Sequence, residues 1–129
     1  MKNILLVIAV FFLTGMLPAA TAVPTISKET LKVRLDSSDV VILDARAEAH
    51  WDASEFKIPG AFRAPAEQVE IWSRYFPKGK TLVVYCACHG LGTSGTVARQ
   101  LMAKGFAHVY ALTGGWREWY ENAYPIQEK

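Results

Sequence analysis

Residues 82–104 read LVVYCACHGLGTSGTVARQLMAK and contain two secondary-structure signals around a cysteine- and glycine-bearing loop. The first four residues are a continuous apolar run, which is typical of a strand buried on both faces of a sheet. Val97, Leu101 and Met102 follow the 3.6-residue spacing of a helix. The segment therefore predicts a strand, a short loop and a helix in direct succession.

Similar signals before and after this segment predict the rest of the architecture. Val40–Leu43 and His108–Leu112 are further candidate strands. Helices are expected after a Ser27 cap and within residues 69–76 and 116–120. Because strands alternate with helices, we predict an α/β fold with a doubly wound parallel sheet and helices on both faces. Sites in such sheets lie beyond the C-terminal ends of the strands.

Residues 1–22 have the pattern of a secretory signal peptide. Lys2 is the only charged residue, Ile4–Leu17 is an uncharged apolar run, and residues 20–22 form an A-x-A cleavage site before Val23. The apolar run is shorter than the roughly 20 residues that a helix needs to span a bilayer. We expect an exported protein, periplasmic in a bacterium, with an uncleaved membrane anchor as the alternative.

Residues 23–129 are long enough for one domain with one core. The whole chain is 51% hydrophobic and 20% charged, with a formal net charge of +2. This composition excludes a disordered chain and gives no electrostatic argument for nucleic acid or an anionic membrane surface as a partner. Stable membrane insertion is not expected once the signal segment is removed.

The loop after the strand has the composition of an anion-binding site next to a thiol. Cys86 and Cys88 stand at the strand end, and the following glycines let successive backbone N–H groups point inward. A helix that begins at Thr93 or Ser94 adds unpaired N–H groups and the positive end of its dipole. These surroundings stabilise a thiolate, the nucleophilic form of cysteine, and would equally stabilise a sulfur anion bound to it.

Five short motifs follow one another along the chain: VILDAR at 41–46, IPGA at 58–61, VYCAC at 84–88, GF at 105–106, and LTGGW at 112–116 followed by Trp119. In this order they resemble the motifs of the rhodanese-like sulfurtransferases. The resemblance implies transfer of a sulfane sulfur through a cysteine persulfide, without a metal or organic cofactor. The implied donors are thiosulfate or a polysulfide, and the implied acceptors are cyanide or a thiol.

The resemblance also selects Cys88 as the catalytic nucleophile. In the family, five residues usually separate the catalytic cysteine from the Ser or Thr that opens the helix, and counting back from Ser94 gives Cys88. Cys86 is then either an inert thiol or a resolving partner. Asp44 and Arg46 are expected to support the site structurally, with a plain surface pair as the alternative. The implied substrate-binding residues are His89, Gly90, Leu91, Gly92, Thr93 and Ser94.

Two departures from the family pattern concern the sulfur donor. Lys57 stands before the IPGA motif, where the family often has histidine, and the loop between Cys86 and Thr96 contains neither Arg nor Lys. Several relatives that use thiosulfate have a basic residue in this loop. His89 is the residue that could take its place as a hydrogen-bond donor.

Other functions use similar residues and predict different behaviour. A non-catalytic module would use the same loop only to bind an anion or a partner, and a thiol–disulfide redox protein would form a reversible bond between Cys86 and Cys88. A phosphatase or arsenate reductase generally needs an Arg where Ser94 closes the loop. A zinc site of the two cysteines and His89 lacks a fourth ligand in the loop.

Overall fold

The computed structural model describes residues 22–129, and residues 1–21 of the predicted signal segment lie outside the described residues. A five-stranded parallel sheet with the strand order β1-β6-β5-β2-β4 forms the centre of the fold. This confirms the predicted α/β class with a parallel sheet. A second, antiparallel sheet pairs β3 with β7. The strands are β1 (Thr25–Ile26), β2 (Val40–Asp44), β3 (Phe56–Lys57), β4 (Phe62–Arg63), β5 (Thr81–Tyr85), β6 (His108–Leu112) and β7 (Gln127–Glu128).

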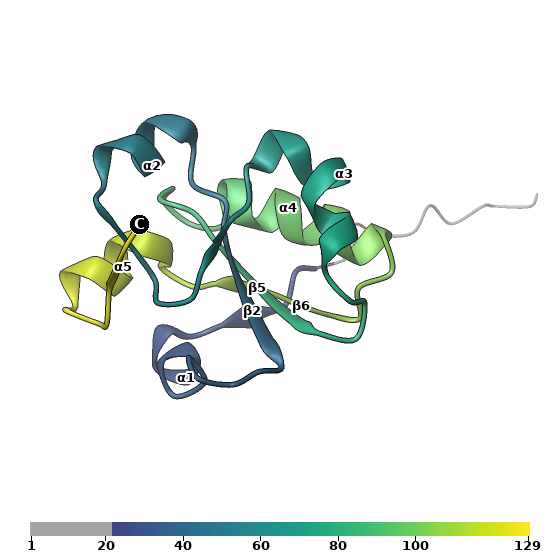
Figure 1. Ribbon diagram of the computed structural model, residues 1–129, viewed down its shortest axis with the longest axis horizontal. Helices are drawn as coiled ribbons and strands as arrows, with labels where there is room; N and C mark the ends of the chain where they lie inside the picture. Colours follow the sequence, from purple (N-terminus) through teal and green to yellow (C-terminus); the bar gives the residue numbers. More distant parts are fainter. Residues whose placement is uncertain (1–21) are drawn as a thin grey trace, which may run out of the picture.

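Helices cover both faces of the five-stranded sheet. Figure 1 shows α3 and α4 on one side of β5 and β6, and α1 on the other. None of the helices within residues 22–129 is long and apolar enough to cross a membrane. The helices are α1 (Lys28–Lys32), α2 (Glu48–Ala53), α3 (Val69–Trp72), α4 (Gly92–Ala103) and α5 (Gly115–Glu121), with the 3-10 turns η1 (Ala66–Gln68) and η2 (Ser73–Tyr75) on either side of α3.

The continuous apolar runs of β2 and β5 contribute to two separate cores. Ile42 and Val83 pack in the cluster that contains residues of α1 and α5. Their neighbours Leu43 and Val84 pack in the cluster with α3 and α4. Because successive side chains of a strand point to opposite faces, a sheet covered on both sides needs apolar residues at every position.

The predicted helices differ in how closely the structure matches them. α1 begins after Ser27, whose Oγ accepts a hydrogen bond from the backbone N–H of Thr30 at 3.1 Å, as the cap signal predicts. The predicted helix within residues 69–76 is instead the short α3 followed by the turn η2. Ile71 and Tyr75 are exposed. The apolar residues of this segment therefore do not form one buried stripe that would favour a continuous helix.

Candidate active site

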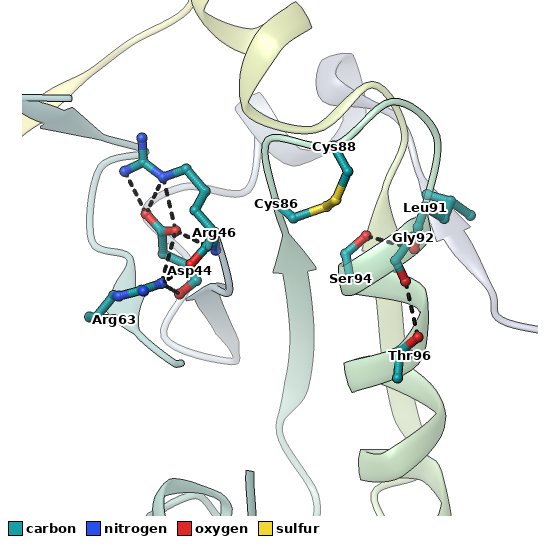
Figure 2. The surroundings of a disulfide bond; sticks show 9 residues. All are labelled: Asp44, Arg46, Arg63, Cys86, Cys88, Leu91, Gly92, Ser94 and Thr96. Atoms are coloured by element: carbon teal, nitrogen blue, oxygen red, sulfur yellow. Dashed lines mark hydrogen bonds and ion pairs between the residues drawn. A yellow bond between two sulfur atoms is a disulfide. The ribbon is translucent and has the colours of Figure 1, made fainter. Parts of the chain in front are cut away.

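The candidate site lies where the two central strands end. β2 and β5 pair in parallel, with Asp44 opposite Tyr85, so the segments that follow both strands leave the sheet at the same edge. The segment after β2 contains Arg46, and the segment after β5 contains the two cysteines. Figure 2 shows this arrangement, with the loop after β5 leading over to the start of α4.

Cys86 and Cys88 are joined by a disulfide. Their Cα atoms are 5.6 Å apart, and one residue separates them in the sequence. Cys86 is buried, with 1% of its surface exposed, whereas Cys88 is half-buried. From the sequence, Cys86 is either an inert thiol or a resolving partner of Cys88. The structure bonds it to Cys88.

Cys88 is the cysteine that faces a cleft. The cleft has a volume of about 340 Å³, and its lining includes Cys88 but not Cys86. A Cβ atom placed on Gly92 would lie 3.8 Å from Cys88 Sγ, so the sulfur lies directly against the first residue of α4. The other lining residues are Ala66, Thr93, Thr96 and Val97.

The backbone between Cys88 and Ser94 presents free hydrogen-bond donors. Within residues 22–129, none of the seven backbone N–H groups from Cys88 to Ser94 makes a hydrogen bond of ordinary length and angle to another protein group. Gly90 has a φ of +72°, a conformation that glycine adopts without strain. We call these seven donors the amide cradle. Free amides followed by a helix N-terminus are suited to holding an anion.

The helix of this site starts slightly earlier than predicted. α4 begins at Gly92, whereas the sequence predicts a start at Thr93 or Ser94. Ser94 does not cap the helix, because its hydroxyl donates back to the carbonyl oxygen of Leu91 at 3.4 Å. The first amides of α4 therefore remain unpaired by any side chain and stay available to a ligand.

A cation from another element reaches the loop. Arg117 on α5 places its Nη1 3.2 Å from each ring nitrogen of His89. The guanidinium charge therefore lies against the His89 ring, equally close to both nitrogens. The Arg117 side chain also pairs with Glu121, at 3.1 Å. The positive charge that the loop sequence lacks is thus supplied by a residue that sequence analysis did not identify.

Asp44 and Arg46 form a buried ion pair, so the surface-pair alternative is wrong. Both side chains are 0% exposed. Arg46 donates from Nε to both carboxylate oxygens at 3.0 Å and from Nη2 to one of them at 2.7 Å. Its guanidinium also lies 4.4 Å from the ring centroid of Trp116 on α5. The pair therefore connects the end of β2 to the helix that carries Arg117.

Tyr85 at the end of β5 completes this buried cluster. Its hydroxyl donates to the Asp44 carboxylate at 2.6 Å and accepts from the backbone N–H of Ile58 at 3.2 Å. Burial, together with the negative charge of Asp44, raises the pKa of Tyr85 far above its usual value. The phenol therefore remains protonated and acts as a donor to the carboxylate. Its second bond ties the cluster to the IPGA turn.

The side chain of Lys57 is used within its own turn and does not line the cleft. Lys57 Nζ donates to the carbonyl oxygen of Ala61 at 2.8 Å. The lysine at the position where the family often has histidine therefore stabilises its own turn. His50 and His108 are exposed, and neither lines the cleft.

The start of α5 packs against the backbone of Cys86. The backbone N–H of Trp116 donates to the Cys86 carbonyl oxygen at 2.9 Å. Gly115 has a φ of +53°, and a Cβ atom there would overlap the same carbonyl oxygen. Glycine is needed at this position because both the backbone conformation and the close approach exclude a side chain.

Replacing Gly115 with alanine should therefore destabilise the fold. We expect a loss of about 2 kcal/mol or more in the free energy of unfolding, from the strained backbone and the clash with Cys86. Gly79→Ala is the matched control, because Gly79 has no atom within 4 Å of an added Cβ and no positive φ. Urea denaturation of both variants measures the difference. Equal stabilities would contradict the close packing of α5 on Cys86.

Known proteins that are similar to this chain include a domain family and two curated relatives. A model of the rhodanese-like domain family matches residues 27–122. Thiosulfate sulfurtransferase GlpE of Coxiella burnetii is 35% identical over 81 residues, which cover 63% of this chain and 72% of the relative. The putative sulfur carrier protein YrkF of Bacillus subtilis is 31% identical over 101 residues, which cover 78% of this chain and 52% of the relative.

Solved structures show the same fold. The rhodanese-like domain of the Anabaena protein Alr3790 superposes with a TM-score of 0.70 at 28% identity, covering 82% of this chain and 80% of that one. A Rhodopseudomonas palustris protein of unknown function, described as a possible tyrosine phosphatase, gives a TM-score of 0.69 at 30% identity, with 81% and 85% covered. With the family match over most of its length, this chain belongs to the rhodanese-like domain family.

Proposed function

We propose that this protein is a sulfurtransferase in which Cys88 carries the transferred sulfur as a persulfide. The observation that carries the proposal is the position of the Cys88 sulfur, in the cleft and against the first residue of α4, beside the amide cradle. The terminal sulfur of a persulfide is an anion, and preorganised N–H donors stabilise such a charge without a side-chain base. The names of the Coxiella and Bacillus relatives support sulfur chemistry of this kind.

The reaction starts from the reduced protein, because the disulfide occupies the Cys88 sulfur. The Cys88 thiolate attacks the outer sulfur of the donor and breaks the donor's S–S bond. With thiosulfate, the bonding electron pair leaves on sulfite. An acceptor nucleophile, cyanide or a thiol, then attacks the terminal sulfur of the persulfide and regenerates the Cys88 thiolate.

The cleft favours a small anionic donor. The hydroxyl-bearing residues Thr93 and Thr96 line it together with the start of α4, and Arg117 adds a positive charge at His89. Thiosulfate and short polysulfides have the matching charge and size. We place this activity outside the cytoplasm, in the periplasm of a bacterium, on the basis of the signal pattern of residues 1–22.

Intact mass spectrometry of the Cys86→Ser protein tests the persulfide. This variant cannot form the internal disulfide, so Cys88 stays available after reduction and desalting. Exposure to thiosulfate or polysulfide should add one sulfur to each chain, and cyanide should remove it. The matched control is the double variant Cys86→Ser with Cys88→Ser. It lacks both thiols and should gain no sulfur. Absence of an added sulfur from every donor would refute a sulfurtransferase.

Removal of the Arg117 charge should weaken binding of an anionic donor. For Arg117→Met we expect a KM for thiosulfate about 2- to 5-fold higher, with a smaller change in kcat, as is typical for one exposed charge. Arg74→Met is the matched control, because Arg74 is also exposed but, unlike Arg117, makes no contact with the loop that follows β5. The effect should shrink at high ionic strength, where the charge is screened. Equal KM values for the two variants would remove Arg117 from donor binding.

A further inference from the structure

The disulfide joins a buried thiol to the thiol that faces the cleft. Cys86 follows β5 directly and is 1% exposed, and its carbonyl oxygen is held by the Trp116 N–H at 2.9 Å. Cys88 lines the cleft beside Gly92. With Cα atoms 5.6 Å apart, the two sulfurs bond within the intact fold, while β5 and α4 keep their regular structure (Figure 2). A thiol on Cys86 is therefore held permanently within reach of the Cys88 sulfur.

We propose that Cys86 resolves the Cys88 persulfide, so that the protein reduces sulfane sulfur to hydrosulfide. This inference rests on the proposed persulfide at Cys88. The Cys86 sulfur attacks the inner sulfur of the persulfide, Cys88 Sγ, and forms the Cys86–Cys88 disulfide. The bond from Cys88 Sγ to the outer sulfur breaks, and that sulfur leaves as HS⁻ with the bonding electron pair and the Cys86 proton. The two cysteines are oxidised by two electrons, and the sulfane sulfur is reduced by two.

The burial of Cys86 restricts its partner to Cys88. Cys86 does not line the cleft, so a donor or a cyanide acceptor in the cleft meets Cys88 first. The departing hydrosulfide is an anion and leaves beside the amide cradle, whose free N–H groups stabilise its charge as they would that of the persulfide. The same donors thus serve the formation of the persulfide and its resolution.

An external dithiol returns the protein to its starting state. Cys88 is the more exposed sulfur of the disulfide, so an incoming thiolate attacks it and releases the Cys86 thiol. The second thiol of the dithiol then displaces Cys88, and the dithiol ends as a disulfide. One cycle consumes one sulfane sulfur and one dithiol and yields one hydrosulfide.

A single-turnover experiment separates this reaction from ordinary sulfur transfer. Reduced, desalted protein is mixed anaerobically with one equivalent of benzenethiosulfonate, whose leaving group is benzenesulfinate and not sulfide. Hydrosulfide is trapped with monobromobimane, and the mass of the intact protein is measured by mass spectrometry. The wild type should release one hydrosulfide per chain and lose two hydrogens. Once the persulfide has formed, hydrosulfide release should be first order, with a rate constant independent of protein concentration, because both thiols belong to one chain.

The Cys86→Ser and Cys86→Ala variants provide the decisive comparison. Each should keep one added sulfur on Cys88 and release at least about tenfold less hydrosulfide than the wild type. Alanine is included because a serine hydroxyl at this buried position can disturb the fold. A wild type that keeps the added sulfur and releases no hydrosulfide would overturn the resolving role and leave the sulfurtransferase intact. Folded Cys86 variants that gain no sulfur would refute the persulfide itself.

Discussion

Replacement of Cys88 with serine should lower sulfur transfer from thiosulfate to cyanide by at least about a thousandfold, because in the proposed mechanism it removes the nucleophile that forms the covalent intermediate. A serine hydroxyl is not ionised at neutral pH, and the oxygen atom cannot carry the persulfide. The amide cradle would remain and could still bind the donor. Thiocyanate formation by reduced protein, followed at several donor concentrations, should therefore show a loss in kcat that no concentration of thiosulfate restores.

Replacement of Cys86 should have a different effect, because the loop spacing assigns the nucleophile to Cys88 and not to Cys86. The Cys86→Ser protein should still transfer sulfur to cyanide, because its Cys88 thiolate faces the cleft as before. Circular dichroism of both variants shows whether a lost activity comes from a lost fold. The reverse result, an inactive Cys86→Ser protein beside an active Cys88→Ser protein, would move the nucleophile to Cys86. The loop before Ser94 would then be two residues longer than in our assignment.

The central strands could be predicted because their burial leaves a strong signal in the sequence. β2 and β5 supply both cores, so residues 40–43 and 82–85 form continuous apolar runs. The shorter elements carry no such signal. β1, β3, β4 and β7 have two residues each, which is too short for any periodicity. α2 buries no residue, so it has no apolar stripe to indicate a helix.

At the site, features of one continuous segment could be predicted and features that join distant segments could not. The loop from Cys86 to Ser94 is local, and its glycines and the following helix indicate an anion site directly. The contact between Arg117 and His89 spans 28 residues and depends on how α5 packs. The bond between Tyr85 and Asp44 spans 41 residues. Only the folded chain determines that this carboxylate is buried and not on the surface.

Arg46→Met should destabilise the protein by about 3–5 kcal/mol, the usual cost of leaving one partner of a buried ion pair alone. The Asp44 carboxylate is 0% exposed and would lose three side-chain hydrogen bonds from the guanidinium. Tyr85 would remain as a donor but cannot neutralise the charge, and the remaining cation, Arg63, has its Nη1 3.8 Å from the carboxylate, beyond hydrogen-bond distance. Urea denaturation should show a lower midpoint. Glu121→Gln, which breaks the exposed pair with Arg117, is the control and should cost less than about 1 kcal/mol.

The double variant Asp44→Asn with Arg46→Met tests whether the loss comes from the uncompensated charge. Removing both charges leaves no buried ion without its partner, so the double variant should be more stable than the sum of the two single losses predicts. Additive losses would assign the effect to packing of the Arg46 side chain on Trp116.

Arg46→Met should also slow sulfur transfer under conditions in which the variant is fully folded, because Arg46 packs on Trp116 and the Trp116 backbone N–H donates to the Cys86 carbonyl oxygen. Unchanged transfer there would limit the ion pair to a role in stability.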